Sequence, residues 1–345
     1  MPSAIPIQNI YYLLCYAWNK LAESELVRVE SQAHHSLFDL LAQVLGNGLR
    51  HVIRLGLARD YVGHVEEIST IRGRLQFDET LRRTFFRSPR VYCRFDDFSH
   101  DILPNQIIKA TLRRLLRYPE LDKEIRASLF PIFRRLDAVS DIALVKRHFG
   151  LVQLHSNNGF YQFLLNVCEL IHDASLPSEG NGDTRFRDFE RDENKMPHLF
   201  EEFVRNFYAR EALRYRVSRK ELQWKAEAVD DFSRQMLPSM KTDIFLESSE
   251  RVIIIDCKFY KEALQRNFDT EKIRNDHLYQ INTYLQNAGT DEDDPRTLDG
   301  ILLYPTVRSS QPASYQLSGY TIGIRSINLD QDWQGIHRDL LAIVD

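Results

Sequence analysis

The segment that most constrains the fold is a run of four β-branched residues, Val252 to Ile255, in the sequence RVIIIDCKFYK. A continuous apolar run is typical of a strand buried on both faces, since a strand with one solvated face shows alternation instead. Such a strand lies in a sheet that helices cover on both sides. The sequence therefore predicts a layered arrangement of helices and sheet around this run.

The segments on either side of the run are consistent with one mixed sheet. We predict a helix over about 197–215, strands near 221–228, 240–247 and 251–259, a helix over about 271–287, strands at 299–305 and 315–325, and a closing helix near 331–343. This order indicates a single mixed sheet with helices on its faces.

The first part of the chain has a different character. Helical spacing of apolar residues covers 9–22, 36–55, 104–118, 121–136 and 157–174, with short strand-like segments near 61–68 and 90–98. A polar stretch at 175–195, rich in Gly, Asn and Asp, separates the two parts. The fold class is therefore α+β or mixed: a mostly helical domain with short strands over residues 1–180, and a mixed-sheet domain over 181–345.

Composition excludes several classes of protein. Gly is scarce, at 14 of 345 residues, and 43% of residues are hydrophobic, which excludes a disordered or low-complexity chain. A net charge of -4 excludes a protein that coats nucleic acid by bulk charge alone. The four cysteines are far apart and form no C-x-x-C pair, which excludes a zinc knuckle. Because the sequence shows neither signal-peptide features nor an apolar run of about 18 residues, we expect a cytoplasmic location.

Three charged residues mark the end of the buried strand. Asp256 and Lys258 lie two positions apart, so both side chains face the same side of a strand. The sequence ESSE at 247–250 predicts a hairpin turn, which places Asp243 near Asp256 on the neighbouring strand. Two such carboxylates suit Mg²⁺, which also takes water and a phosphate oxygen. A metal there activates water, and Lys258 is predicted to position that water; the alternative is an exposed strand end with surface charges.

A second polar pair is predicted near these residues. Gln280 and Tyr284 lie four positions apart on the predicted helix and so share one face. They are candidates to support Lys258 or to contact a DNA phosphate, the alternative being a polar helix face. Cys257 faces the opposite side of its strand and is interpreted as core filling.

Asp243, then Asp256-Cys257-Lys258, then Gln280-x-x-x-Tyr284 resembles the motif of the PD-(D/E)xK nuclease superfamily, with Thr242 in place of the motif proline. Over essentially its full length the sequence is similar to the McrC subunits of McrBC modification-dependent restriction systems. The similar segments are IPIQNIYYLLCYAW, Ile71-Arg72-Gly73-Arg74 with Phe77, Asn105, Ile108-Lys109, FRDFERDE, Thr242-Asp243-Ile244 and IIIDCKFYK.

The resemblance implies a Mg²⁺-dependent DNA endonuclease in the second domain, which would have a restriction-endonuclease-like fold. Asp243, Asp256 and the backbone carbonyl of Cys257 would hold the metal. Family members place a further acid on an upstream helix; Glu201 and Glu202 both qualify, and Glu201 is favoured.

The resemblance also implies partners. Residues 1–180 would bind an McrB-like AAA+ GTPase hexamer, which would bind GTP and recognise double-stranded DNA containing 5-methylcytosine. The chain itself has no G-x-x-x-x-G-K-[ST] sequence, consistent with GTP binding by the partner.

An arginine-rich segment lies in the first domain. Residues 81–90, LRRTFFRSPR, hold four arginines and no acid. Because arginine pairs readily with phosphates, these arginines and those of the IRGR sequence are candidates for contact with DNA or a partner: Arg72, Arg74, Arg82, Arg83, Arg87 and Arg90. The alternatives are a solvated helix with a buried phenylalanine pair and, for IRGR, a turn at a strand end.

Two other functions are compatible with the sequence. The chain could be a non-catalytic regulatory subunit that activates the partner GTPase through an inert nuclease fold. It could also be a stand-alone repair or junction-resolving nuclease, which would cut DNA without a nucleotide or a partner.

Overall fold

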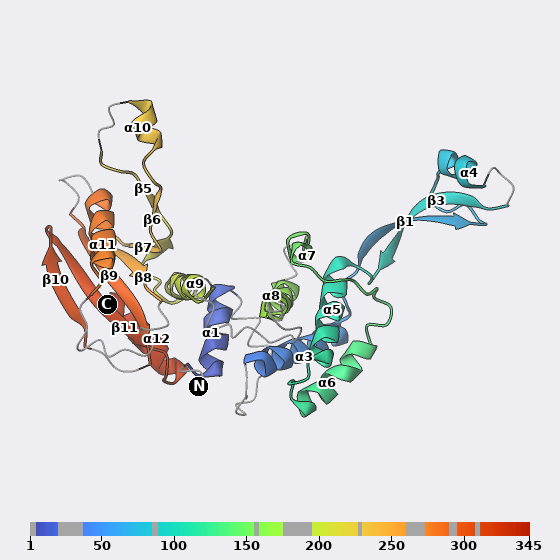
Figure 1. Ribbon diagram of the computed structural model, residues 1–345, viewed down its shortest axis with the longest axis horizontal. Coiled ribbons are helices and arrows are strands. Elements are labelled where there is room, and N and C mark those ends of the chain that lie inside the picture. Colours follow the sequence, from blue (N-terminus) through green and yellow to red (C-terminus); the bar gives the residue numbers. More distant parts are fainter. Residues whose placement is uncertain are drawn as a thin grey trace, which may run out of the picture. The chain divides into compact units, whose positions relative to one another are not determined.

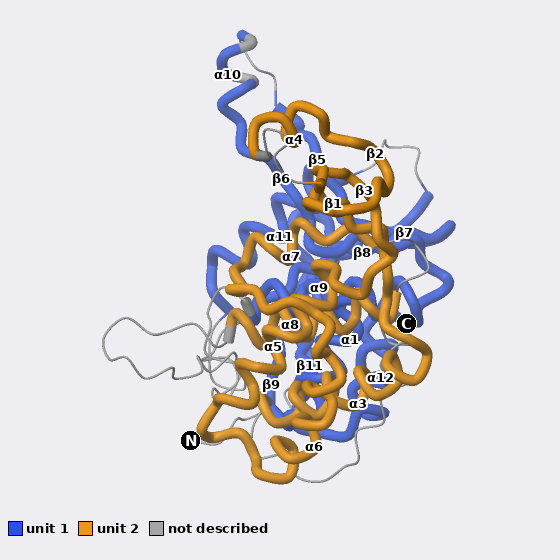
Figure 2. The backbone as a smooth tube through the Cα atoms, turned by 90° about the vertical axis from the view of Figure 1, so that its right-hand side faces the viewer, with its two compact units in different colours: residues 1–24, 177–345 blue, residues 25–176 orange. Residues whose placement is uncertain are grey.

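The computed structural model describes residues 5–19, 37–84, 89–154, 159–174, 195–226, 230–259, 273–289, 295–307 and 311–345. The chain forms two compact units: unit 1 comprises residues 1–24 and 177–345, and unit 2 comprises residues 25–176 (Figure 2). In the described ranges, no helix has the length and apolar character needed to cross a membrane.

The N-terminal helix does not belong to the domain that the sequence predicts for it. The predicted first domain begins at residue 1, whereas the structure places residues 1–24 in unit 1 with the second half of the chain. Helix α1 (Ile7–Ala17) packs against α9 (Lys195–Glu211). Its apolar spacing shows that it needs a partner surface, but spacing along one helix does not say which surface that is.

Side-chain hydrogen bonds fasten α1 to unit 1. The amide Nδ2 of buried Asn9 donates to the carbonyl oxygens of Leu329 and Gln331, each at 2.8 Å. The ring of Tyr12 stacks on Trp333 with centroids 4.9 Å apart. At the other end of α1, Nδ2 of Asn206 donates to two terminal carbonyls of the helix. These bonds satisfy backbone groups that a helix end would otherwise leave unpaired.

Unit 1 is built on a six-stranded mixed sheet with the strand order β10-β11-β9-β8-β7-β4 (Figure 1). The central strands β8, β9 and β11 are parallel, and β7, β4 and β10 are antiparallel to their neighbours. The predicted mixed sheet is therefore present. The strands in chain order are β4 (Arg216–Ser218), β7 (Ile244–Glu247), β8 (Arg251–Cys257), β9 (Thr297–Thr306), β10 (Ala313–Leu317) and β11 (Tyr320–Asn328).

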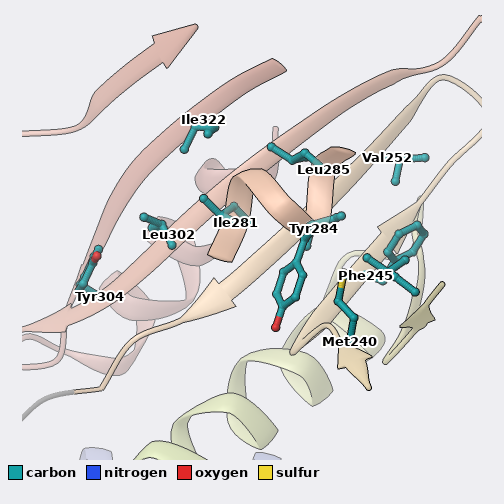
Figure 3. Packing of buried hydrophobic residues seen from close by; sticks show 11 residues of the cluster. Met240, Phe245, Val252, Ile281, Tyr284, Leu285, Leu302, Tyr304 and Ile322 are labelled. Atoms are coloured by element: carbon teal, nitrogen blue, oxygen red, sulfur yellow. The ribbon is translucent and has the colours of Figure 1, made fainter. Parts of the chain in front are cut away.

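Strand β8 is buried on both faces, as its β-branched run predicts. Val252 and Ile254 belong to a core cluster that includes Ile281 and Leu285 of helix α11 (Asn275–Ala288) (Figure 3). The intervening side chains, Ile253 and Ile255, point to the other face and are also fully buried. Helices α9 and α12 (Trp333–Val344) also pack against the sheet.

The structure differs from the predicted strands in two places. The segment 315–325 is not one strand, because Ser318 (φ 54°) and Gly319 (φ 85°) form a turn between β10 and β11. Two successive residues with positive φ are typical of tight hairpin turns. The predicted strand at 221–228 is reduced to β5 (Glu221–Leu222), which pairs with β6 (Met240–Lys241), and a short helix, α10 (Asp231–Gln235), lies between them in the chain.

Unit 2 has a helical body and an arm (Figure 1). Gly46 permits close packing within the body, because a Cβ there would lie 2.7 Å from Cδ2 of Leu129. The body comprises α3 (Leu37–Leu55), α5 (Leu103–Arg117), α6 (Lys123–Arg134), α7 (Arg147–Gly150) and α8 (Gly159–Ala174). The arm comprises β1 (Asp60–Ile68), β2 (Arg74–Leu75), α4 (Phe77–Thr84) and β3 (Val91–Ser99).

A buried asparagine fastens the arm to the body. Asn105, at the start of α5, donates from Nδ2 to the carbonyls of Ala58 (3.0 Å) and His100 (2.7 Å), one at each end of the arm. Its Oδ1 accepts a hydrogen bond from the hydroxyl of Tyr161 on α8. The two ends of the arm are thereby held together on the helical body.

Replacing Asn9 with Ala will destabilise unit 1. The change leaves the carbonyls of Leu329 and Gln331 without their buried donor, so we expect the free energy of unfolding to fall by about 2 kcal/mol. Urea unfolding followed by tryptophan fluorescence measures the loss. Gln8→Ala, at an exposed position on the same helix, is the matched control and will change little. Equal stability of the two variants would show that these hydrogen bonds do not anchor α1.

Candidate functional site

The β7–β8 hairpin brings Asp243 and Asp256 together. Ile244 is paired with Ile255 in the antiparallel register, so the preceding Asp243 lies opposite Asp256. The backbone N–H of Cys257 donates to Oδ2 of Asp243 at 2.9 Å. This bond fixes the Asp243 carboxylate beside the end of β8, as the hairpin spacing predicts.

Lys258 is the cation that faces the buried carboxylate. The Asp256 side chain is fully buried, and its Oδ2 lies 2.7 Å from Nζ of Lys258, whose side chain is 11% exposed. The other oxygen, Oδ1, is buried without a hydrogen-bond partner among the described residues. Such an unsatisfied buried oxygen is costly unless a further group binds it.

Helix α11 orients the lysine through a chain of hydrogen bonds. Nζ of Lys258 donates to Oε1 of Gln280 at 2.8 Å, and Nε2 of Gln280 donates to the hydroxyl of Tyr284 at 2.8 Å. The hydroxyl of Tyr284 donates to the carbonyl of Lys241 at 3.0 Å, which fixes the direction of the whole chain. Figure 3 shows the ring of Tyr284 extending from α11 toward Met240 on β6.

Burial and mutual repulsion make the carboxylates easier to protonate. Burial, and then the charge of Asp243, raises the pKa of Asp256 to about 7, although Lys258 opposes the rise. Burial also raises the pKa of Asp243, against the opposing effect of the Cys257 N–H. Acids held together in this way are typical of functional sites, because a protein without a role for them avoids burying like charges.

The two candidate helix acids, Glu201 and Glu202, have different surroundings in the structure. Burial and the charge of Asp243 raise the pKa of Glu201 to about 7, and Oε2 of Glu201 lies 3.3 Å from Nη2 of Arg219. Glu202 forms an ion pair with Arg205 on its own helix and lies 3.6 Å from Arg219. Of the two acids, Glu201 is therefore the one that interacts electrostatically with Asp243 and Asp256. Its part in the site stays a prediction.

The oxygen donors of the site suit a hard divalent cation. Asp243 and Asp256 offer carboxylate oxygens, one of them unsatisfied, and the neighbouring backbone carbonyl of Cys257 is the further candidate ligand. Burial raises the pKa of the Cys257 thiol well above its usual value, so the thiol stays protonated and does not compete with the carboxylates for the cation. No cluster of three or more His, Cys, Asp or Glu ligands occurs within the described ranges. Mg²⁺ is held in this way, by few carboxylates, with water and phosphate completing the octahedron.

Sequence reasoning missed one residue next to this group. His277 is almost fully buried on α11, one turn before Gln280, and its Nδ1 lies 2.8 Å from the hydroxyl of Tyr304. Burial, and then the charge of Lys258, lowers the pKa of His277 to about 4, so the ring is neutral. Its i, i+3 spacing from Gln280 is the signal that could have pointed to it.

The candidate arginines that the structure describes lie in the arm of unit 2. Arg72 forms a 2.5 Å ion pair with Asp97 and lies over the ring of Phe95, while Arg83 pairs with Glu79. Arg74 is on β2, Arg82 is in the last turn of α4 and Arg90 directly precedes β3; all three are exposed. Arg87 and the phenylalanine pair lie outside the described residues.

The fold and this group of side chains define a mixed α/β protein with a buried carboxylate–lysine site. A family model described as "McrBC 5-methylcytosine restriction system component" matches residues 8–305. The chain is 36% identical over 341 residues to a protein of Escherichia coli (strain K12) named "Type IV methyl-directed restriction enzyme EcoKMcrBC", covering 99% of this chain and 97% of the relative.

The chain therefore belongs to the McrBC family of 5-methylcytosine restriction system components, as the resemblance predicts. The fold is similar to a chain in a solved half-complex from the tetradecameric assembly of Thermococcus gammatolerans McrB AAA+ hexamers with bound McrC. That match has a TM-score of 0.59 and 18% identity, and covers 98% of this chain and 76% of the other.

The raised pKa of Asp256 predicts a pH dependence of stability in metal-free protein. The folded protein holds a proton on Asp256 up to about pH 7, whereas the unfolded chain loses it near pH 3.8. The free energy of unfolding will therefore fall as pH rises between these values and will level off above them. Asp256→Asn, which cannot ionise, will lose this part of the slope.

Urea unfolding in the presence of a chelator, at several pH values across this range, provides the measurement. Asp330→Asn, which removes an exposed carboxylate, is the matched control and will keep the wild-type slope. A slope in Asp256→Asn equal to that of the wild type would show that Asp256 titrates normally.

Proposed function

We propose that this protein is the nuclease subunit of a modification-dependent restriction complex and that it hydrolyses DNA phosphodiester bonds with Mg²⁺. The observation that carries the proposal is the cluster of Asp243, Asp256 and Lys258 at the end of one hairpin, with Lys258 oriented by Gln280. Membership of the McrBC family and the name of the E. coli relative, a restriction enzyme, support it.

The residues of the site have distinct roles in this proposal. Asp243, Asp256 and the carbonyl of Cys257 would hold Mg²⁺, which supplies charge neutralisation at the phosphate and a more acidic bound water. Oδ1 of Asp256 has no hydrogen-bond partner among the described residues and is therefore the oxygen available to the metal. In a PD-(D/E)xK-type, restriction-endonuclease-like fold, this end of the β7–β8 hairpin would lie beside the DNA backbone.

Lys258 would position the attacking water, whose oxygen adds to phosphorus as the bond from phosphorus to the leaving oxygen breaks. Its Nζ contacts Asp256 and Gln280, so the ammonium group lies beside a carboxylate that would bind the metal. The Gln280–Tyr284–Lys241 chain limits the motion of Nζ. Positioning of this kind lowers the barrier by removing misaligned arrangements before the reaction.

We further propose that an McrB-like AAA+ GTPase hexamer is the partner, that it binds GTP, and that the complex acts in the cytoplasm on double-stranded DNA containing modified cytosine. The similar solved structure contains McrB AAA+ hexamers with bound McrC. Unit 2 is the candidate partner-binding part, because its arm exposes large apolar side chains, which mark interaction sites when they gather on one surface. They are Tyr61, Val65, Ile71, Leu75, Phe77, Leu81 and Phe98.

Replacing Asp256 with Ala will abolish DNA cleavage and leave stimulation of the partner's GTPase intact. The loss should be at least about 10²- to 10³-fold in rate, because a metal ligand supplies several kcal/mol of transition-state stabilisation. The assay mixes the protein, its partner, methylated plasmid, GTP and Mg²⁺, and follows cleavage and phosphate release in parallel. Asp330→Ala is the control. Mg²⁺-dependent cutting by Asp256→Ala would refute the assignment.

Replacing Gln280 with Ala will slow cleavage without weakening DNA binding. Lys258 loses the acceptor that orients Nζ, so we expect a rate reduced by about tenfold or more, equivalent to about 1.4 kcal/mol. Cleavage rates at saturating partner and binding of uncleaved DNA are measured separately. Gln286→Ala, on an exposed position of the same helix, is the control. A change in binding with an unchanged rate would indicate that Gln280 contacts DNA instead.

A further inference from the structure

A second polar site lies in unit 2, where α3 packs against α6 (Figure 1). Arg50 and Arg54 of α3 and Arg135, which directly follows α6, line one open pocket of about 440 Å³. Pockets that bind small molecules have volumes of roughly 300 to 1,000 Å³. The pocket therefore has room for a ligand and presents three permanent positive charges to it.

The arginines of this pocket differ in their partners from other arginines of unit 2. Nη1 of Arg50 donates to Oδ1 of Asn47 at 2.5 Å and Nη2 donates to the carbonyl of Ser128 at 3.4 Å, and both acceptors are neutral. In the parts of the chain that the structure describes, none of the three arginines forms an ion pair with a carboxylate. Other arginines of unit 2, such as Arg83 and Arg113, do form such pairs.

Repulsion among the three arginines favours the binding of an anion. Arg50 and Arg54 are four residues apart on one helix, where like charges repel, and Arg135 lines the same pocket. The helix dipole is negative at the C-terminal end, so it favours an arginine near the C-terminal end of α3 and of α6. That effect explains single arginines at such positions, but not the convergence of three on one pocket.

The walls of the pocket strengthen the attraction for an oxyanion. Ile53, Pro131 and Ile132 supply apolar surface next to the guanidinium groups, which reduces competition by water. Asn47 and Ser128 hold Arg50 in place, so less side-chain freedom is lost on binding. Guanidinium groups match phosphate through paired N–H···O bonds.

We propose that this pocket is a binding site for a phosphate group, carried either by the DNA backbone or by a free phosphate compound. Carboxylates also pair with arginine, but three guanidinium groups suit the higher charge and the additional oxygens of a phosphate. The site is in unit 2, whereas the carboxylate–lysine site is in unit 1, so the inference does not depend on the proposed nuclease activity.

The test uses the full-length protein and the double variant Arg54→Gln, Arg135→Gln. Both positions are exposed, so the variant will fold normally, as a thermal melt will check. The matched control is the double variant Arg117→Gln, Arg134→Gln, which removes the same charge from exposed positions of unit 2 outside the pocket. Isothermal titration calorimetry measures binding of inorganic pyrophosphate, and fluorescence anisotropy measures binding of a double-stranded oligonucleotide at several salt concentrations.

The two measurements distinguish the sources of the phosphate. For a free phosphate compound, pyrophosphate will bind the wild type and the control, and at least tenfold more weakly the pocket variant. For the DNA backbone, the pocket variant will lower the slope of log affinity against log salt by about 0.9 for each DNA phosphate that the protein no longer neutralises. Unchanged binding of both probes by the pocket variant would overturn the proposal, as would equally weakened binding in the control.

Discussion

The burial of Asp256 is the constraint on which the geometry of unit 1 depends. A carboxylate without exposed surface is tolerated only where neighbouring groups compensate its charge or keep it protonated. Here the compensation comes from Lys258, which directly follows strand β8, and the lysine is in turn bound by Gln280 of α11. The hairpin, the helix above the sheet and the lysine are thus linked through one buried charge.

Much of the structure around Asp256 could be predicted from local sequence patterns. The apolar run of β8 predicts a strand buried on both faces, and both Ile253 and Ile254 are fully buried. The turn between β7 and β8, at 248–250, sets the register that places Asp243 opposite Asp256, because an antiparallel hairpin allows only one pairing once its turn is fixed. The four-residue spacing of Gln280 and Tyr284 similarly predicts a shared face, and their side chains are hydrogen-bonded. Each of these inferences spans a few residues.

Features that depend on contacts between distant segments could not be predicted from local sequence patterns. Glu201 and Glu202 are adjacent on α9, and only the position of that helix against the sheet brings Glu201 near Asp243. The burial of His277 requires α11 to pack against β9, on which Tyr304 lies, and the arginine pocket requires α3 and α6 to pack together. The split of 315–325 into two strands had a local signal, Ser318-Gly319, but that signal was outweighed by the surrounding β-forming residues.

The assignment of α1 to unit 1 has a consequence for how the protein is synthesised. Unit 2 is an insertion between the first 24 residues and residue 177, so unit 1 is assembled from two separate parts of the chain. Domains generally fold as units while the ribosome is still adding residues. The inserted unit can therefore complete its core first, and α1 must wait for α9 and α12 to emerge. The carboxylate–lysine site is consequently one of the last parts of the newly made molecule to form.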